Sequence, residues 1–273
     1  MTALHRHQIA HVRESAWDRL LRADWDAQAR SCLAHWAERG LPLVVTRQPA
    51  DLPEGEIAMG LCAPARWGHR RLALRVRWAE VLYFDEFPRL DQLVTQLPRG
   101  TWAAARELVA ALRACGATAR VFGSHGWQAL SGLPHVREGS DLDVWVAVDG
   151  PVQADAAAAA MQAFEAPARR LDGELVLAGD AAIAWREWRD WRSGRVSALL
   201  VKRLRGPSLG PLTLTGPPDR PLLVDVEVEV DVEGAGAGAG EGARIAVDLD
   251  LDPAGAASAG ERSHAVGAAE VSA

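Results

Sequence analysis

The stretch that decides the fold of this chain is residues 121–148, which read VFGSHGWQALSGLPHVREGSDLDVWVAV. It begins as the end of a strand that turns into a helix at Gly123 and Ser124. Asp141 and Asp143 then open an apolar run. Because alternate side chains of a strand point to the same face, we expect the two carboxylates to lie side by side at one strand end. A carboxylate pair beside a Gly-Ser helix start can hold a divalent metal and a polyphosphate together, which indicates nucleotidyl transfer.

Nucleotidyl transfer needs little covalent chemistry from a protein, but it needs neutralised phosphate oxygens and an aligned nucleophile. Two Mg²⁺ ions about 3.5–4 Å apart, held by carboxylates, supply most of this. Asp141 and Asp143 are the residues that we expect to bridge Mg²⁺ or Mn²⁺. Gly123 lets the backbone approach phosphate closely, and the Ser124 hydroxyl with the first helix amides can hold the β/γ end of a triphosphate. The alternatives are a plain helix cap at Ser124 and two surface acids.

Helical and strand patterns alternate along the chain, which predicts an α/β (α+β) protein. We expect a small N-terminal α/β domain over residues 1–95, a nucleotidyltransferase-like mixed-sheet domain over 96–215, and an acidic Gly/Ala-rich tail over 216–273. Thr101 is expected to cap a helix. The predicted helices are 17–39, 101–115, a short one up to 130, and 154–163. The predicted strands are 43–46, 55–61, 72–78, 118–122, 141–148, 168–177, 181–185 and 196–201.

Charge is unevenly distributed along the 273 residues, whose formal net charge is −6. Residues 216–273 hold 12 of the 36 acidic but only 3 of the 30 basic residues, so this segment carries −9 and the remainder +3. A weakly basic body suits an anionic small molecule or an acidic protein partner, and the bias is too small for duplex nucleic acid. Valine alternates with acid over 224–232, and the Gly-Ala run that follows does not fit a dinucleotide-binding fingerprint. We therefore expect a disordered tail.

The cysteine and hydropathy patterns argue against zinc-ribbon, disulfide-rich, secreted and membrane-spanning proteins. Cys32, Cys62 and Cys115 lie far apart without a Cys-x-x-Cys pair, which excludes a zinc site built on paired cysteines and argues against a disulfide framework. The first residues lack the apolar stretch of a signal peptide, and no window approaches the ~20 apolar residues of a membrane span. We therefore expect a soluble, cytoplasmic protein that binds neither membrane nor nucleic acid.

Tryptophan and arginine alternate near the end of the expected catalytic domain: Trp185, Trp188 and Trp191 with Arg186, Arg189 and Arg192. Three-residue spacing places the tryptophans on one helix face, where we expect them to pack as a stripe. The arginines are then solvated or lie near an anionic donor.

Gly-Ser followed by Asp-x-Asp resembles the polymerase-β-like nucleotidyltransferase superfamily. A fuller set of strings is more specific: GSHGWQALSGLP from residue 123, SDLD from 140, LDGEL from 171 and AWREW from 184. Together these strings are similar to the phosphoribosyl-dephospho-CoA transferase family of malonate decarboxylase, also called its holo-acyl-carrier-protein synthases. The resemblance spans residues 1 to about 213 and leaves the acidic tail outside.

The resemblance implies a particular reaction and a third metal ligand. The donor would be 2′-(5″-triphosphoribosyl)-3′-dephospho-CoA, and the acceptor would be a serine of the decarboxylase's acyl-carrier subunit, with release of pyrophosphate. The superfamily places a third acid on a neighbouring strand, for which we choose Asp172, with Glu174 and Glu187 as alternatives. Lys202, after the strand expected at 196–201, is a candidate phosphate ligand or a solvated lysine.

Two other functions stay open at this point. An adenylyltransferase of the same superfamily would modify a small molecule or a protein and should use ATP. A non-catalytic module that only binds the carrier protein has no need for adjacent carboxylates at a phosphate turn. The N-terminal domain is expected to shape the donor site or to dock the carrier. His125 is a weaker candidate for a base, and metal binding at His5, His7 and His11 is not favoured.

Overall fold

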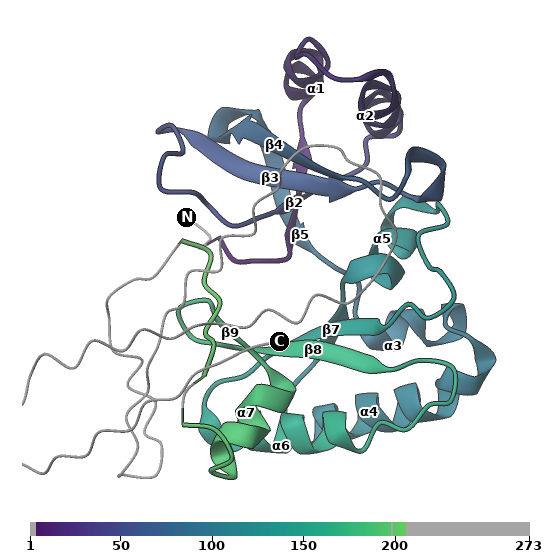
Figure 1. Ribbon diagram of the computed structural model, residues 1–273, viewed down its shortest axis with the longest axis vertical. Coiled ribbons are helices and arrows are strands. Elements are labelled where there is room, and N and C mark those ends of the chain that lie inside the picture. Colours follow the sequence, from purple (N-terminus) through teal and green to yellow (C-terminus); the bar gives the residue numbers. More distant parts are fainter. Residues whose placement is uncertain (1–3, 198, 206–273) are drawn as a thin grey trace, which may run out of the picture. The chain divides into compact units, whose positions relative to one another are not determined.

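The computed structural model describes residues 4–197 and 199–205, which form two β-sheets with helices packed on them (Figure 1). The expected tail over 216–273 and the end of the expected catalytic domain lie outside the described residues. The mixed content of helices and strands confirms the predicted α/β class. Among the described residues, no helix is both long enough and apolar enough to cross a lipid bilayer.

The N-terminal sheet is antiparallel, with strand order β4-β3-β2-β1-β5. Its strands are β1 (Gln8–Val12), β2 (Leu43–Val45), β3 (Glu56–Cys62), β4 (Arg71–Arg77) and β5 (Val81–Glu86). Exposed and buried residues alternate strictly along β4, as expected for a strand with one face on the core. The sequence analysis missed β1 and β5, although β1 is an inner strand that joins β2 to β5.

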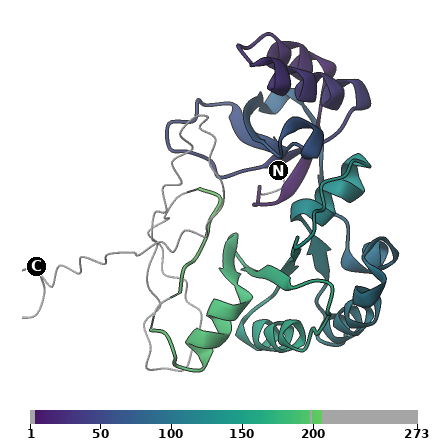
Figure 2. The same cartoon turned by 45° about the vertical axis from the view of Figure 1, so that its right-hand side comes forward.

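Two helices, α1 (Glu14–Leu21) and α2 (Ala27–Arg39), cover the outer face of this sheet and are drawn in purple in Figure 2. The prediction of one continuous helix over 17–39 was wrong. Asp26 starts a new helix, because its carboxylate accepts a hydrogen bond from the Ala29 amide at 2.9 Å. Gly40 ends α2 in the left-handed conformation, with φ at 59°.

The second sheet has the order β6-β7-β8-β9, in which β7 and β8 run parallel and the other neighbours antiparallel. Its strands are β6 (Ala119–Val121), β7 (Leu142–Ala147), β8 (Leu171–Leu177) and β9 (Ala181–Ala184). The chain passes from β7 to β8 through α6 (Pro151–Gln162), because parallel neighbours require a long crossover. The described part of 196–201 forms no strand, so that prediction was wrong. Lys202 instead makes a single bridge with Ala182.

Three helices cover one face of the second sheet: α4 (Trp102–Ala114), α6 and α7 (Trp185–Arg192) (Figure 1). Leu142, Val144 and Val146 of β7 are fully buried in the core beneath these helices. The alternate residues Asp141 and Asp143 therefore face the opposite side of the sheet. The tryptophans of α7 are buried, which confirms the predicted stripe.

Shorter helices complete the described chain. They are α3 (Leu90–Leu93) and the 3₁₀ turns Ala65–Trp67, Trp78–Glu80, Val94–Gln96 and Arg99–Thr101. Thr101 precedes α4, as predicted, but its side chain makes no capping hydrogen bond. The last of these turns therefore leads into α4 without a side-chain cap.

Helix α5 (Gly123–Ser131) connects the two hydrophobic cores. It follows β6 directly, yet its Trp127 belongs to the N-terminal core, with its ring centroid 5.7 Å from that of Phe87 and 6.4 Å from that of Trp36. A Cβ at Gly126 would approach the Phe87 ring to 2.8 Å, so a glycine is needed for this close packing. Helix α5 is therefore fixed by its connection to β6 of the second sheet and by the packing of Trp127 in the N-terminal core.

Candidate active site

The start of α5 lies against a carboxylate of β7. Gly123 has φ at 59°, and a Cβ at this position would collide with the side chain of Asp143. The amide of Phe122 also donates a hydrogen bond to the Asp143 carbonyl oxygen at 3.0 Å. The glycine of the Gly-Ser motif is therefore required both by its backbone angle and by the space that the carboxylate occupies.

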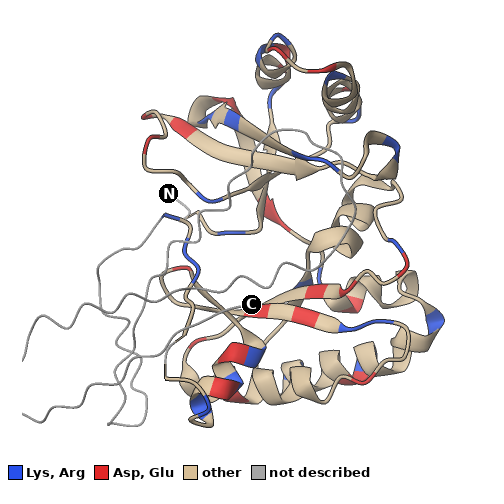
Figure 3. Ribbon diagram, viewed as in Figure 1, with Lys and Arg blue, Asp and Glu red and all other residues tan. Residues whose placement is uncertain are grey.

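Three carboxylates gather at the edge where β7 and β8 begin. Asp143 and Asp172 occupy matching register positions on these parallel neighbours, and Asp141 precedes Asp143 by one strand repeat. Figure 3 shows the acidic segments of β7 and β8 next to each other. Burial, followed by the charges of Asp172 and Asp141, raises the pKa of Asp143 to about 6. The sequence-predicted triad is thus brought together.

Two arginines that the sequence analysis did not assign to specific acids neutralise the outer members of this triad. Arg170 makes a two-point ion pair with Asp141, with Nε 3.1 Å from Oδ1 and a second contact at Oδ2. This pairing lowers the pKa of Asp141. Arg186 donates to Asp172 Oδ1 at 3.0 Å and to the Leu171 carbonyl at 2.7 Å. Asp141 and Asp172 are therefore each paired with an arginine, and Asp143 is the third carboxylate.

The donor set suits a hard divalent cation. Carboxylate oxygens are the ligands that Mg²⁺ prefers, and mutual repulsion of the three acids favours any cation placed among them. Within the described part of the chain, no three His, Cys, Asp or Glu side chains already converge into a closed metal-binding group. Asp141 is instead ion-paired with Arg170, and Asp172 is ion-paired with Arg186.

Glu174, the first alternative to Asp172, occupies a different environment. Its buried carboxylate lies 3.0 Å from His7 Nε2, 2.9 Å from Lys202 Nζ and 3.7 Å from an Arg6 nitrogen. Burial alone would raise the pKa of Glu174, but the His7 hydrogen bond and the surrounding positive charges hold it well below its usual range. Lys202 is thus engaged by Glu174, and the sequence analysis offered no signal for this pairing.

The remaining candidates lie at the start of helices. Ser124 is the second residue of α5, and Phe122 occupies the cap position, so the plain-cap alternative for Ser124 is wrong. His125 is buried, its Nε2 atom has no hydrogen-bond partner among the described residues, and burial lowers its pKa to about 4. His125 is therefore a neutral core histidine at pH 7. Glu187 lies in the first turn of α7.

Comparisons with known proteins show which family this chain resembles. Residues 5–87 match the family model described as phosphoribosyl-dephospho-CoA transferase MdcG N-terminal domain, and residues 89–212 match that of the MdcG C-terminal domain. A phosphoribosyl-dephospho-CoA transferase from Xanthomonas campestris pv. campestris (strain 8004) is 35% identical over 203 residues, covering 72% of this chain and 93% of the relative. One from Bradyrhizobium diazoefficiens is 36% identical over 200 residues, covering 73% and 86%. No solved structure matches the chain significantly.

The family models and the named relatives show that this protein is a transferase enzyme. The match covers both sheets, since the two family models together span nearly all of the described residues. The chain belongs to the phosphoribosyl-dephospho-CoA transferase family. The resemblance inferred from the short sequence motifs is therefore confirmed.

Proposed function

We propose that this chain transfers the 2′-(5″-phosphoribosyl)-3′-dephospho-CoA group from its triphosphoribosyl precursor to a serine of the malonate decarboxylase acyl-carrier subunit. The family supports the transferred group, because its members carry this activity in their names. The observation that carries the site assignment is the cluster of Asp141, Asp143 and Asp172 against the glycine that opens α5. Carboxylates beside a helix start suit nucleotidyl transfer, because they can hold metal ions against phosphate oxygens while the helix amides bind the phosphates.

The reaction is a displacement at the α-phosphorus of the triphosphate. The serine oxygen forms a bond to this phosphorus, the bond to the β-phosphate bridging oxygen breaks, and pyrophosphate leaves. The serine proton is released as the phosphodiester forms. The acceptor thus gains the prosthetic group, and phosphorus changes neither its oxidation state nor its number of bonds.

Asp141, Asp143 and Asp172 are the residues that would hold a divalent metal, Mg²⁺ or Mn²⁺. When bound, the metal would neutralise phosphate oxygens and lower the cost of deprotonating the serine. The first amides of α5 and the Ser124 hydroxyl are suited to bind the terminal phosphates, because helix amino termini attract anions. Gly123 keeps that helix start within contact of Asp143.

The protonation state of Asp143 supports this assignment. A carboxyl with a pKa of about 6 loses its proton more readily when a cation or an additional positive charge enters the cluster. The two flanking acids are already paired with Arg170 and Arg186. Among the described residues, Asp143 is therefore the member of the triad that forms no ion pair with an arginine.

The proposal is tested by intact-protein mass spectrometry of the purified apo carrier subunit, incubated with this protein and Mg²⁺. Triphosphoribosyl-dephospho-CoA should produce the mass gain of the phosphoribosyl-dephospho-CoA group, and ATP should produce none. A gain of AMP instead would indicate an adenylyltransferase. No gain from either donor, with folded protein, would favour a module that binds the carrier without modifying it.

A further inference from the structure

A cavity of about 580 Å³ opens directly beside the carboxylate cluster. It is bounded by the connection from α6 to β8, by the residues leading into β7, and by the first turn of α7. Asp141 lines it and belongs to the proposed metal site as well. Its volume lies within the range of pockets that enclose small ligands. The proposed reaction assigns no part of the donor to this space.

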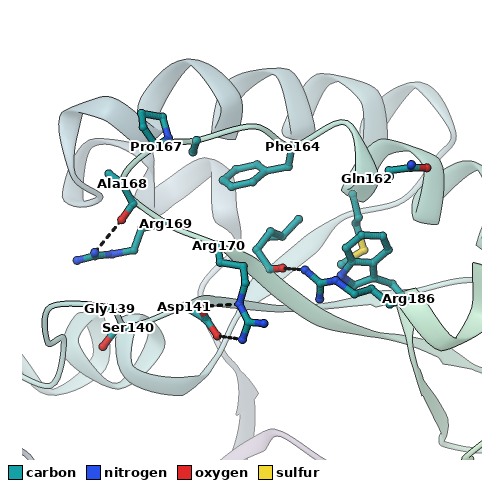
Figure 4. Close-up of a pocket in the computed structure, with 14 residues that line it drawn as sticks. Gly139, Ser140, Asp141, Gln162, Phe164, Pro167, Ala168, Arg169, Arg170 and Arg186 are labelled. Atoms are coloured by element: carbon teal, nitrogen blue, oxygen red, sulfur yellow. Dashed lines mark hydrogen bonds and ion pairs between the residues drawn. The ribbon is translucent and has the colours of Figure 1, made fainter.

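One side of the cavity is apolar and partly aromatic. Phe164, Pro167 and Leu171 line it together with Met161 and Trp185, which are buried. Figure 4 shows the Phe164 ring directed into the cavity from the connection between α6 and β8. Phe164 is half-buried, so its ring provides a surface on which a flat heterocycle can stack.

The other side of the cavity carries an excess of arginine. Arg170 and Arg186 lie along the strand side in Figure 4, and Arg169 contributes a third guanidinium group. Among the described residues, Asp141 is the one carboxylate that lines the cavity with them. The Nε atom of Arg169 is buried without a hydrogen-bond partner among the described residues. Arginine forks recognise phosphates in a bidentate manner, so this wall suits a ligand with two or more phosphate charges.

We propose that the cavity binds the adenine and the 5′-diphosphate of the donor's dephospho-CoA part. This inference rests on the proposed function, because it concerns the same donor. The triphosphoribosyl group is attached to the adenosine ribose, so one sugar separates the adenosine from the reacting phosphate. An adenosine seated beside Phe164 therefore places the triphosphate toward Asp141 and Asp143. The pantetheine arm then extends outward, toward solvent.

The test uses dephospho-CoA itself, which lacks the triphosphoribosyl group and does not need the metal site. We expect isothermal calorimetry of the full chain without metal to detect its binding. Phe164→Ala removes the stacking surface and should weaken binding about tenfold or more, and Phe164→Tyr should restore it. Arg170→Gln should weaken binding by a similar factor, because a guanidinium–phosphate contact is lost.

Two matched controls are available. Val152→Ala truncates an exposed apolar residue at the far end of α6, and Arg113→Gln removes an exposed arginine on α4. Both should leave the dissociation constant within twofold of the wild-type value. Circular dichroism and thermal unfolding should establish that each variant is folded. Unchanged affinity in both Phe164→Ala and Arg170→Gln would overturn the inference.

Competition identifies which end of dephospho-CoA occupies the cavity. ADP should displace dephospho-CoA from the wild type, and 4′-phosphopantetheine should not; the reverse result would overturn the inference. Asp143→Asn should retain dephospho-CoA affinity while losing transfer, because Asp143 does not line the cavity. If the wild type modifies the carrier but does not bind dephospho-CoA, the proposed function stands and the cavity assignment fails. If binding follows the expected pattern without any transfer, only the proposed function fails.

Discussion

Gly123 and Asp143 are in direct contact: any side chain on residue 123 would occupy the space of the Asp143 carboxylate. The two residues come from different elements, the start of α5 and the start of β7. Their contact brings the proposed phosphate-binding helix start to the proposed metal ligand. Because Gly123 has no side chain, the start of α5 can approach the Asp143 carboxylate this closely.

Replacing this glycine tests the contact. Gly123→Ala should displace Asp143 and lower transfer by about a hundredfold or more, since a shift of about 1 Å in a reacting group has an effect of that size. Gly132→Ala at the other end of α5 is the matched control, because its φ is 69° but a Cβ there meets nothing within 4 Å. The control should lose only about 1–2 kcal/mol of stability. Equal activity in the two variants would contradict the account.

The choice of Asp172 over Glu174 as the third acid is testable by separating activity from stability. Asp172→Asn should abolish transfer and leave unfolding in urea nearly unchanged, because Asp172 is substantially exposed. Glu174→Gln leaves Arg6 and Lys202 without their buried counter-charge, and should lower the free energy of unfolding by about 2–3 kcal/mol. A stable Glu174→Gln variant without activity, beside an active Asp172→Asn, would reverse the assignment.

Arg170 should compete with metal for Asp141. We expect Arg170→Gln to bind Mn²⁺ severalfold more tightly than the wild type in the absence of donor, because a neighbouring positive charge is removed. Electron paramagnetic resonance of free Mn²⁺ measures this directly. Arg113→Gln, far from the cluster, should bind Mn²⁺ as the wild type does. Weaker binding in Arg170→Gln would mean that the arginine helps to build the metal site.

Two buried histidines should make stability depend on pH. Burial lowers the pKa of His125 and that of His135 to about 4, so the unfolded chain takes up protons first as the pH falls. Each histidine contributes its full share to the free energy of unfolding above pH 6.5 and loses it progressively between pH 6.5 and 4. The loss is about 2 kcal/mol for each histidine at pH 5. His135→Gln should reduce the difference in urea stability between pH 7 and pH 5 by about that amount. An unchanged difference would refute the burial of a neutral His135.

The sequence predicted the carboxylate edge of the second sheet better than the rest of the fold. Asp141 and Asp143 share a face because strand periodicity is local. Asp172 was chosen from the family resemblance, and it lies at the matching register because the α6 crossover makes β7 and β8 parallel neighbours. The Gly-Ser turn was also visible locally. These features depend on residues close together in the sequence or on a single crossover.

Features that depend on distant segments were not predictable in the same way. Strand β1 is short and is stabilised by pairing with β5, about 70 residues away. Glu174 shares a hydrogen bond with His7, 167 residues earlier, and only the tertiary structure reveals this contact. The pairing of Arg170 with Asp141 likewise spans 29 residues. Periodicity carries no information about such contacts.

The measurement that tests the central claim most directly compares Asp143→Asn with Asp149→Asn, a matched change in an exposed residue just beyond the other end of β7. Each variant is incubated with apo carrier subunit, Mg²⁺ and triphosphoribosyl-dephospho-CoA, and the intact mass of the carrier is recorded. We predict that Asp149→Asn adds the phosphoribosyl-dephospho-CoA group as the wild type does and that folded Asp143→Asn adds none. Full modification by Asp143→Asn would contradict a carboxylate-based transferase site at this edge.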